Sequence, residues 1–218
     1  MPDFDTARLN MVEGQLRPNQ VSDERLLQAF ETVPRERFVP AAARSIAYVD
    51  EDLKVASGRY MMEPMVLGRL LQTAAIEPSD VVLVIGAGPG YACAIAAHLA
   101  ATVVGLESDA GLADQAESGL DALSVDNSVI VRGQFNEGYR KQAPYDVILI
   151  HGAVHEIPDR IAEQLADGGR LVTVEREGPG MGKAVVLERF ADAFGKRHVF
   201  DAATPVLPGF EVTPGFVF

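Results

Sequence analysis

The chain has 218 residues, of which 48% are hydrophobic and 23% are charged, and its formal net charge is −12 at pH 7. This length suits one well-buried core and is short for two independent domains. The negative charge argues against nucleic-acid binding because phosphates would be repelled, and no apolar run reaches the roughly 18 residues needed to cross a bilayer.

A lone cysteine, Cys93, excludes an internal disulfide, which suits a reducing compartment. Its neighbours are alanine and isoleucine, so we expect it to fill a small space in the core. Residues 1–10 show no apolar leader. Together these features predict a cytoplasmic protein.

The first helices are expected in residues 22–34 and 64–76, which place apolar side chains on one helical face. Ser22 is the expected N-cap of the first helix, and Pro64 fits the first turn of the second. Residues 35–37 are expected to form a charged helix exit with no further role. This part of the chain therefore predicts a helical region rather than a sheet.

From residue 80 onward the pattern alternates between strands and helices. Strands are predicted at residues 81–86, 102–107, 128–133, 145–152 and 170–175, and helices at 91–100, 109–123 and 158–169. Continuous Val/Ile/Leu runs indicate strands that are covered on both faces, so we expect a mostly parallel sheet in a three-layer α/β fold. Residues 183–190 and 196–203 predict an antiparallel hairpin at its end. We expect one domain, with residues 1–76 as a helical cap and acceptor loop and residues 77–218 as the core.

A glycine turn, "GAGPGY", follows the first predicted strand. A dinucleotide fingerprint needs a third glycine where Tyr91 stands, which argues against NAD or FAD. The spacing of Gly86, Gly88 and Gly90 instead matches the G-x-G-x-G turn of S-adenosylmethionine-dependent methyltransferases. The alternative is a glycine-rich turn that only bends the chain.

An acid, Glu107, ends the next predicted strand. A carboxylate at this place can accept hydrogen bonds from both hydroxyls of a ribose, and it disfavours a 2′-phosphate. The alternative is a solvated carboxylate at a strand end. With the glycine turn, Glu107 favours a site for an adenosine-type ribose.

Several segments, taken in order, resemble the protein-L-isoaspartate O-methyltransferase family. These are "MVEGQL", "LLQAFETVPRERFVP", "AYVDEDL", "GAGPGY", "APYDVILI" and "IPDRIAEQLADGGRLV", followed by the final hairpin. The resemblance implies a Rossmann-like methyltransferase fold and methyl transfer from S-adenosylmethionine to a carboxylate on damaged protein or peptide. A carboxylate is already ionised at neutral pH, so this reaction requires placement and exclusion of water rather than a general base.

The resemblance also implies the residues of the site. The positions matching the cofactor contacts are Gly86, Ala87, Gly88, Gly90, Glu107, Gln134 and Phe135. Tyr60 and Met62 stand where the family's acceptor loop carries a threonine and a serine, so both small hydroxyls are replaced. Val84 replaces the acid before the turn and Gln134 replaces the acid near the adenine, where its carbonyl can still accept a hydrogen bond and Phe135 can stack on the ring.

These departures leave two main functions open. One is a methyltransferase whose rebuilt loop serves a different acceptor, and the other is an inactive homologue that binds cofactor, peptide or partner without turnover. A dehydrogenase is a third and more distant alternative. The sequence identifies neither the acceptor nor the choice between monomer and homodimer.

Two histidines, His151 and His155, with Glu156, follow the fourth core strand, where ligands lie in open α/β sheets. Two histidines and one acid fall short of a metal signature, so no metal is predicted and their role stays open. The apolar tail with Phe210, Phe216 and Phe218 predicts either packing on the sheet or a homodimer contact.

Overall fold

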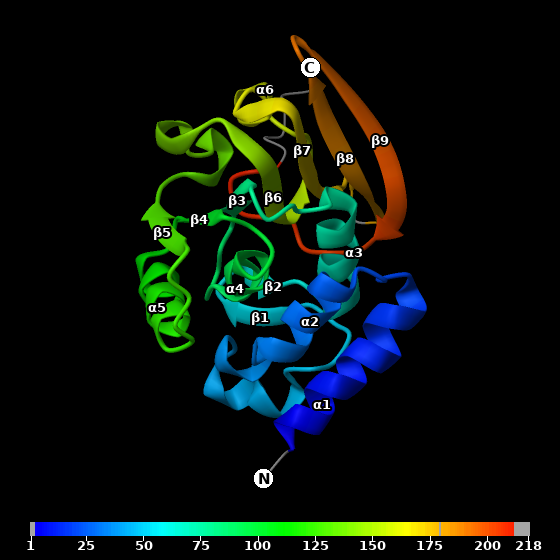
Figure 1. Cartoon of the computed structure of the whole chain (residues 1–218), viewed down its shortest axis with the longest axis vertical. Helices are drawn as coiled ribbons and strands as arrows, with labels where there is room; N and C mark the ends of the chain where they lie inside the picture. Colours follow the sequence, from blue (N-terminus) through cyan, green and yellow to red (C-terminus); the bar gives the residue numbers. More distant parts are fainter. Residues whose placement is uncertain (1–2, 179, 212–218) are drawn as a thin grey trace, which may run out of the picture.

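The computed structural model describes residues 3–178 and 180–211, and its centre is a seven-stranded sheet (Figure 1). Strand order across the sheet is β5-β4-β3-β6-β7-β8-β9. The strands are β3 (Val81–Ile85), β4 (Thr102–Glu107), β5 (Ser128–Arg132), β6 (Tyr145–Val154), β7 (Leu165–Glu175), β8 (Gly182–Phe190) and β9 (Ala193–Ala202). The first five pair in parallel, and β8 and β9 pair antiparallel. The predicted parallel sheet with an antiparallel end is confirmed.

The central strands of the sheet are buried on both faces, as their apolar runs predict. Alternate residues of β3 point to opposite sides, so that Val82 and Val84 join one core cluster while Leu83 and Ile85 join the other. Because β4 and β6 flank β3, the strand order reverses there, and ligands of open α/β sheets bind at the carboxyl ends of strands beside such a reversal.

Most of the helices belong to the cap or pack on one face of the sheet, and the last one packs on the other face. Their bounds are α1 (Phe4–Met11), α2 (Glu24–Thr32), α3 (Pro64–Ala74), α4 (Tyr91–Ala97), α5 (Ala110–Asp121) and α6 (Asp159–Ala162). Helix α3 begins at Pro64, as predicted. The N-cap of α2 is Asp23 rather than Ser22, because the Asp23 carboxylate accepts the N–H groups of Arg25 and Leu26.

The helix predicted at residues 158–169 is reduced to the single turn α6. Strand β7 begins already at Leu165, which pairs with Tyr145 at the start of β6. Gly168 and Gly169 weaken helix formation here, and Gly168 adopts a positive φ of 76°. Pairing with the sheet therefore prevails over the helical pattern of the segment.

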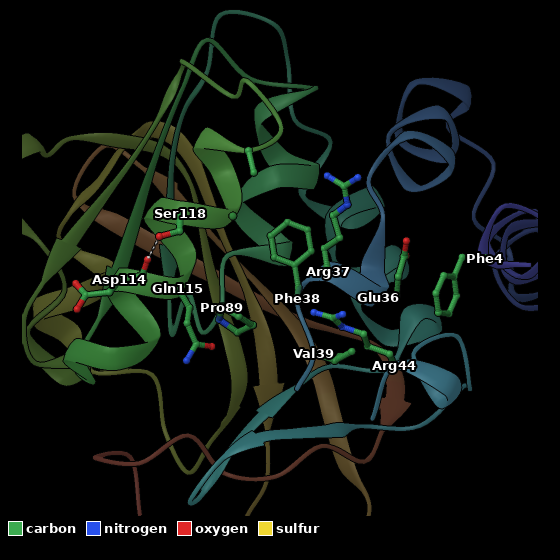
Figure 2. Close-up of a pocket in the computed structure, with 12 residues that line it drawn as sticks. Phe4, Glu36, Arg37, Phe38, Val39, Arg44, Pro89, Asp114, Gln115 and Ser118 are labelled. Carbon is green, nitrogen blue, oxygen red and sulfur yellow. Dashed lines mark hydrogen bonds between the residues drawn. The ribbon is translucent and has the colours of Figure 1, made fainter. Parts of the chain in front are cut away.

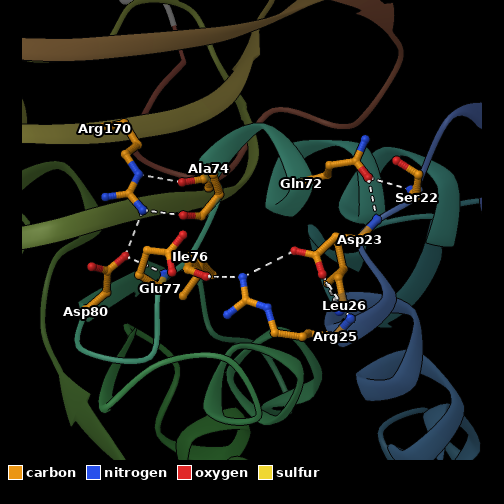
Figure 3. Close-up of polar contacts among 11 residues, drawn as sticks. Ser22, Asp23, Arg25, Leu26, Gln72, Ala74, Ile76, Glu77, Asp80 and Arg170 are labelled. Carbon is orange, nitrogen blue, oxygen red and sulfur yellow. Dashed lines mark hydrogen bonds and ion pairs between the residues drawn. The ribbon is translucent and has the colours of Figure 1, made fainter.

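The cap packs directly on the sheet, at the lower part of Figure 1. Figure 3 shows the polar part of this junction: the Arg170 guanidinium of β7 donates to the carbonyls of Ala74 and Ala75 and pairs with Asp80. The side-chain carbonyl of Gln72 accepts the N–H of Ser22, which ties the start of the α2 segment to α3. None of the helices in the described ranges is long and apolar enough to cross a membrane.

Two segments cover the carboxyl ends of the central strands. The first is a small antiparallel hairpin of β1 (Leu53–Ala56) and β2 (Arg59–Met61). The second is the chain around residues 204–207, where Leu207 N–H donates to Ala153 O of β6 at 2.8 Å. Phe210 is buried, whereas Phe216 and Phe218 lie outside the described residues. Cys93 is buried in the core, as predicted.

Candidate active site

The glycine turn between β3 and α4 has a backbone that requires glycine. Gly86, Gly88 and Gly90 have φ angles of 82°, 57° and 102°, all in the left-handed region. A Cβ on Gly90 would lie 3.2 Å from the Cα of Ala116, so this glycine also lets α4 start close to α5. The N–H groups of Gly86 and Ala87 both donate to Leu106 O at 3.0 Å, which fixes the turn against β4.

Glu107 ends β4 beside this turn and is fully buried. Its Oε2 accepts the N–H of Gly88 at 2.7 Å, and its Oε1 accepts the N–H groups of Ser108 and Asp109 at 2.8 and 2.9 Å. The carboxylate thus points toward the glycine turn, where the sequence places it.

The same carboxylate carries an ion pair that the sequence did not predict. Arg59 of β2 reaches it with both ends of its guanidinium: Nη1 bonds Oε1, and Nη2 bonds Oε2 at 2.9 Å. The Arg59 guanidinium carbon also lies 4.7 Å from the ring centroid of Phe135. With only 5% of its surface exposed, Arg59 is a buried cation between Glu107 and Phe135.

Met62, at the expected acceptor position, has both its backbone N–H and its backbone carbonyl hydrogen-bonded to side chains. Its N–H donates to His151 Nε2 at 3.4 Å, and its carbonyl accepts Arg35 Nη2 at 2.7 Å. The Met62 side chain is buried, whereas that of Tyr60 is half-buried. The structure therefore holds this segment rigidly against β6 and the cap.

His151 joins the glycine turn to this segment. Its Nδ1 lies 3.3 Å from Gly86 O, and since a carbonyl can only accept, Nδ1 carries the proton while Nε2 accepts the Met62 N–H. Burial, and then the positive charges of Arg59 and Arg35, lower the pKa of His151 to about 3. His151 is therefore neutral at physiological pH.

The comparisons with known proteins agree over most of the chain. Residues 8–191 match the family model described as protein-L-isoaspartate(D-aspartate) O-methyltransferase. The chain belongs to the protein-L-isoaspartate(D-aspartate) O-methyltransferase family. This confirms the resemblance drawn from the sequence segments.

Two relatives, both named protein-L-isoaspartate O-methyltransferase, show the extent of the likeness. That of Koribacter versatilis is 41% identical over 169 residues, which cover 78% of this chain and 76% of the relative. That of Methanoregula boonei is 38% identical over 192 residues, 88% of each protein.

Solved structures show the same fold at lower identity. One protein-L-isoaspartate O-methyltransferase superposes with a TM-score of 0.82 at 22% identity, covering 93% of this chain and 66% of the solved chain, just under two thirds of its length. A second, from Plasmodium falciparum in complex with S-adenosyl-L-homocysteine, has a TM-score of 0.78 at 17% identity and covers 95% of this chain and 99% of that one.

The residue types of this family member suit S-adenosylmethionine, and in this structure Arg59 and Leu207 lie against the residues that would hold it. A carboxylate has about four lone-pair sites, and Glu107 already accepts five N–H bonds, so ribose hydroxyls find no free acceptor. A Cβ on Gly86 would lie 3.0 Å from the Leu207 methyl groups, so Leu207 packs on the bare backbone of the turn. A cavity of about 10 Å³ beside Tyr60 and His151 lies at the end of β6, and neither Glu107 nor Phe135 lines it.

The other cofactor positions implied by the family are spread around this edge. Phe135 is buried beneath Arg59, while Gln134 is exposed and precedes it. Val84 is fully buried in the core, as an apolar residue in place of an acid would be. His155 directly follows β6 and is half-buried, and it is not among the residues that contact Glu107.

Arg35 has a further role, which the sequence analysis did not expect of the charged helix exit. It is fully buried, and its Nε donates to Ala47 O at 2.8 Å while Nη2 binds the Met62 carbonyl. Its guanidinium carbon lies 4.9 Å from the Tyr91 ring centroid, and burial lowers the pKa of Arg35. The prediction was wrong because two carbonyls and an aromatic face, all distant in sequence, take up the charge. Arg35 thereby ties the cap to the acceptor segment.

Two acidic side chains flank the hairpin in the sequence, Asp52 just before β1 and Glu63 shortly after β2. Asp52 accepts the Glu63 N–H at 3.1 Å and the Thr204 hydroxyl at 3.2 Å, and burial raises its pKa. Burial, together with repulsion from Asp52, Asp50 and Glu51, raises the pKa of Glu63 to about 7. Glu63 is therefore the group near the acceptor segment that changes charge at physiological pH.

A larger hollow of about 800 Å³ lies between the cap and α5 (Figure 2). Phe38, Arg37 and Arg44 line it from the cap, and Pro89 and Asp114 from the glycine turn and α5. Neither Glu107 nor Arg59 is among its lining residues. This hollow is therefore separate from the edge where the family's cofactor is expected.

Sequence reasoning missed Arg59 although it directly precedes Tyr60 in the acceptor loop, within the stretch "GRYMMEP". The signal that points to it is indirect. A strand-end acid as buried as Glu107 requires a counter-charge or several donors, and Arg59 is a cation in a segment predicted to lie over the same edge.

Proposed function

We propose that this protein is an S-adenosylmethionine-dependent methyltransferase that esterifies carboxylates of proteins or peptides, with isoaspartyl residues as the first acceptor to test. The observation that carries the proposal is the family match over residues 8–191, which runs continuously through the glycine turn and Glu107. The cofactor positions we propose are Gly86, Ala87, Gly88, Gly90, Glu107, Gln134 and Phe135.

The residues of this chain supply placement and exclusion of water. An isoaspartyl carboxylate is ionised at neutral pH, so no side chain has to remove a proton. We propose that Tyr60 and Met62 form the acceptor wall, with Arg35 and His151 fixing the Met62 peptide as a platform. The hairpin and the 204–207 segment cover the strand ends, which keeps water from the reacting groups.

The charge of the chain argues against one class of partner. At a net charge of −12 the surface repels phosphate backbones, so we propose no nucleic-acid partner. We further propose that residues 1–76 and 77–218 act as one unit in the cytoplasm, as a monomer or a homodimer.

Transfer of a labelled methyl group from S-adenosylmethionine to an isoaspartyl peptide tests the proposal. The matched control is the same peptide with an ordinary aspartyl linkage, which we expect to stay unlabelled. Binding of S-adenosylhomocysteine without labelling of either peptide, or of a mixture of aged proteins, would contradict turnover and indicate an inactive homologue. Labelling of aged proteins but not of the isoaspartyl peptide would indicate another carboxylate acceptor.

A further inference from the structure

Arg59 contacts the two groups that the proposed function assigns to the adenosine of the cofactor. Its guanidinium bonds both oxygens of Glu107, the proposed ribose acceptor, and lies 4.7 Å from the ring centroid of Phe135, the proposed stacking partner of adenine. We propose that Arg59 is an internal competitor of adenosine, so that the cofactor binds only when Arg59 leaves Glu107. This inference rests on the proposed function.

The competition follows from the hydrogen-bonding capacity of Glu107. Three of its five N–H donors belong to the backbone of Gly88, Ser108 and Asp109 and stay in place as long as the turn is folded. The two donors of Arg59 are the ones that can be exchanged. Ribose hydroxyls therefore replace Arg59 and cannot add to it.

The shape of the guanidinium makes Arg59 a suitable occupant. It is planar and cationic, so it can lie against an aromatic ring and form a two-pronged contact with a carboxylate at once. Adenosine would make the same pair of contacts with its ring and its ribose. A lysine at this position has no planar group and donates from a single point.

Departure of Arg59 leaves no unsupported anion. Glu107 keeps its three backbone N–H bonds, and a carboxylate with two or three such bonds is well stabilised in its charged form. Arg59 Nε has no hydrogen-bond partner among the described residues, so only the two terminal contacts have to be exchanged. Gly58, which precedes it with a φ of 67°, is exposed at the tip of the hairpin.

The competition also connects the two halves of the proposed site. Arg59 and Tyr60 are neighbours on strand β2, and Met62 directly follows that strand. Adenosine binding at Glu107 therefore frees the Arg59 side chain of β2, while Arg35 and His151 continue to hold the Met62 peptide where the acceptor is to be positioned. Arg59 acts here as a positioning residue, through Glu107 and the hairpin.

Calorimetric titration with S-adenosylhomocysteine tests the competition without turnover. The apparent Kd of a site is its intrinsic Kd divided by the fraction of open molecules, so for a site that is closed in nine molecules of ten we expect Arg59→Met to lower the Kd about ten-fold. The control is Arg132→Met, since Arg132 pairs with Asp114 on the surface and stands opposite Glu107 on β5. We expect its Kd to equal that of the unchanged protein.

Each result decides between the two proposals. Measurable binding that is equal or weaker in Arg59→Met overturns the competition and leaves the proposed function standing. No binding by the unchanged protein or by any variant overturns both. If circular dichroism shows that Arg59→Met is unfolded, Arg59→Lys replaces it: a Kd below that of the unchanged protein supports the competition, and an unaltered Kd overturns it.

Discussion

The glycine turn and the β1–β2 hairpin meet at Glu107, yet they are held in different ways. The turn is fixed by backbone groups, since Gly86 N–H and Ala87 N–H donate to Leu106 O and Gly88 N–H donates to Glu107. The hairpin is fixed to the sheet edge and the cap largely through side chains, above all those of Arg59, Arg35 and His151.

This difference coincides with one in the family pattern, which the glycine turn keeps and the acceptor loop does not. A backbone-held turn depends on glycine spacing, which is intact. A side-chain-held hairpin depends on individual residues, and Tyr60 and Met62 replace the family's hydroxyl residues in that segment. The hairpin is therefore the part of the site in which the acceptor, and access to the cofactor position, can change without altering the fold.

The contact between the two regions gives the largest expected effect. Glu107→Ala leaves the Arg59 cation buried without its carboxylate, and we expect it to lower the free energy of unfolding by about 3–5 kcal/mol. Arg59→Met leaves Glu107 with three backbone donors, so we expect a smaller loss of about 1–3 kcal/mol. Urea denaturation of both variants and of the double variant measures the coupling.

Equal losses in the two single variants would contradict this asymmetry, because Glu107 without Arg59 would then be as poorly compensated as Arg59 without Glu107. The double variant also clarifies a cofactor-binding test with Glu107→Ala. Weaker binding by Glu107→Ala alone has two causes, loss of the ribose acceptor and disturbance by the unpaired Arg59 cation. The double variant lacks the second cause, so its binding separates the two.

The next largest expected effect is a loss of folding stability at acidic pH, caused by His151. Its pKa is lowered to about 3 in the folded protein against 6.5 when unfolded, so the unfolded chain binds the proton first and stability falls as pH drops below 6.5. Between pH 7.5 and pH 5 we expect a loss of about 2 kcal/mol from this residue. Denaturation of His151→Gln across this range should lack that part of the slope. An unchanged slope would place the acid sensitivity in other groups.

Glu63 gives the smallest effect, with the opposite sign. Its pKa is raised to about 7 in the folded protein from the ordinary value of 4.5, so the folded state binds the proton more tightly and stability falls as pH rises from 4.5 through 7. Because Glu63 is half-exposed, solvent screening reduces the effect, and we expect Glu63→Gln to stabilise the protein by about 1 kcal/mol at pH 8.

The stability gained by Glu63→Gln should vanish near pH 4.5, because Glu63 of the folded protein is then protonated and as neutral as glutamine. Thermal denaturation at pH 4.5 and pH 8 measures both values. A gain of the same size at the two pH values would mean that packing of the amide, and not the lost charge, is responsible.

Most of the sheet was predictable because its signals are local. Apolar runs identified the strands of the parallel sheet, and the glycine spacing located the turn beside Glu107. Local signals were misleading at two places. Asp23 rather than Ser22 caps α2, and the helical pattern at 158–169 gives way to β7, whose pairing with β6 a local pattern does not contain.

The charged core of the site was not predictable in the same way. Arg35 and Arg59 look like surface residues in the sequence, and both are buried. Their partners, the Met62 carbonyl and Glu107, are distant along the chain, so only the folded structure shows that the charges are compensated. Buried arginines of this kind are specified by tertiary contacts and leave no periodic signal.

The packing of Leu207 on Gly86 has a consequence for truncation of the chain. Strand β9 ends at Ala202, so a chain cut after that residue keeps every strand of the sheet but lacks Leu207, whose methyl groups lie 3.0 Å from the place of a Cβ on Gly86. Such a chain would leave the bare backbone of the glycine turn uncovered at this edge.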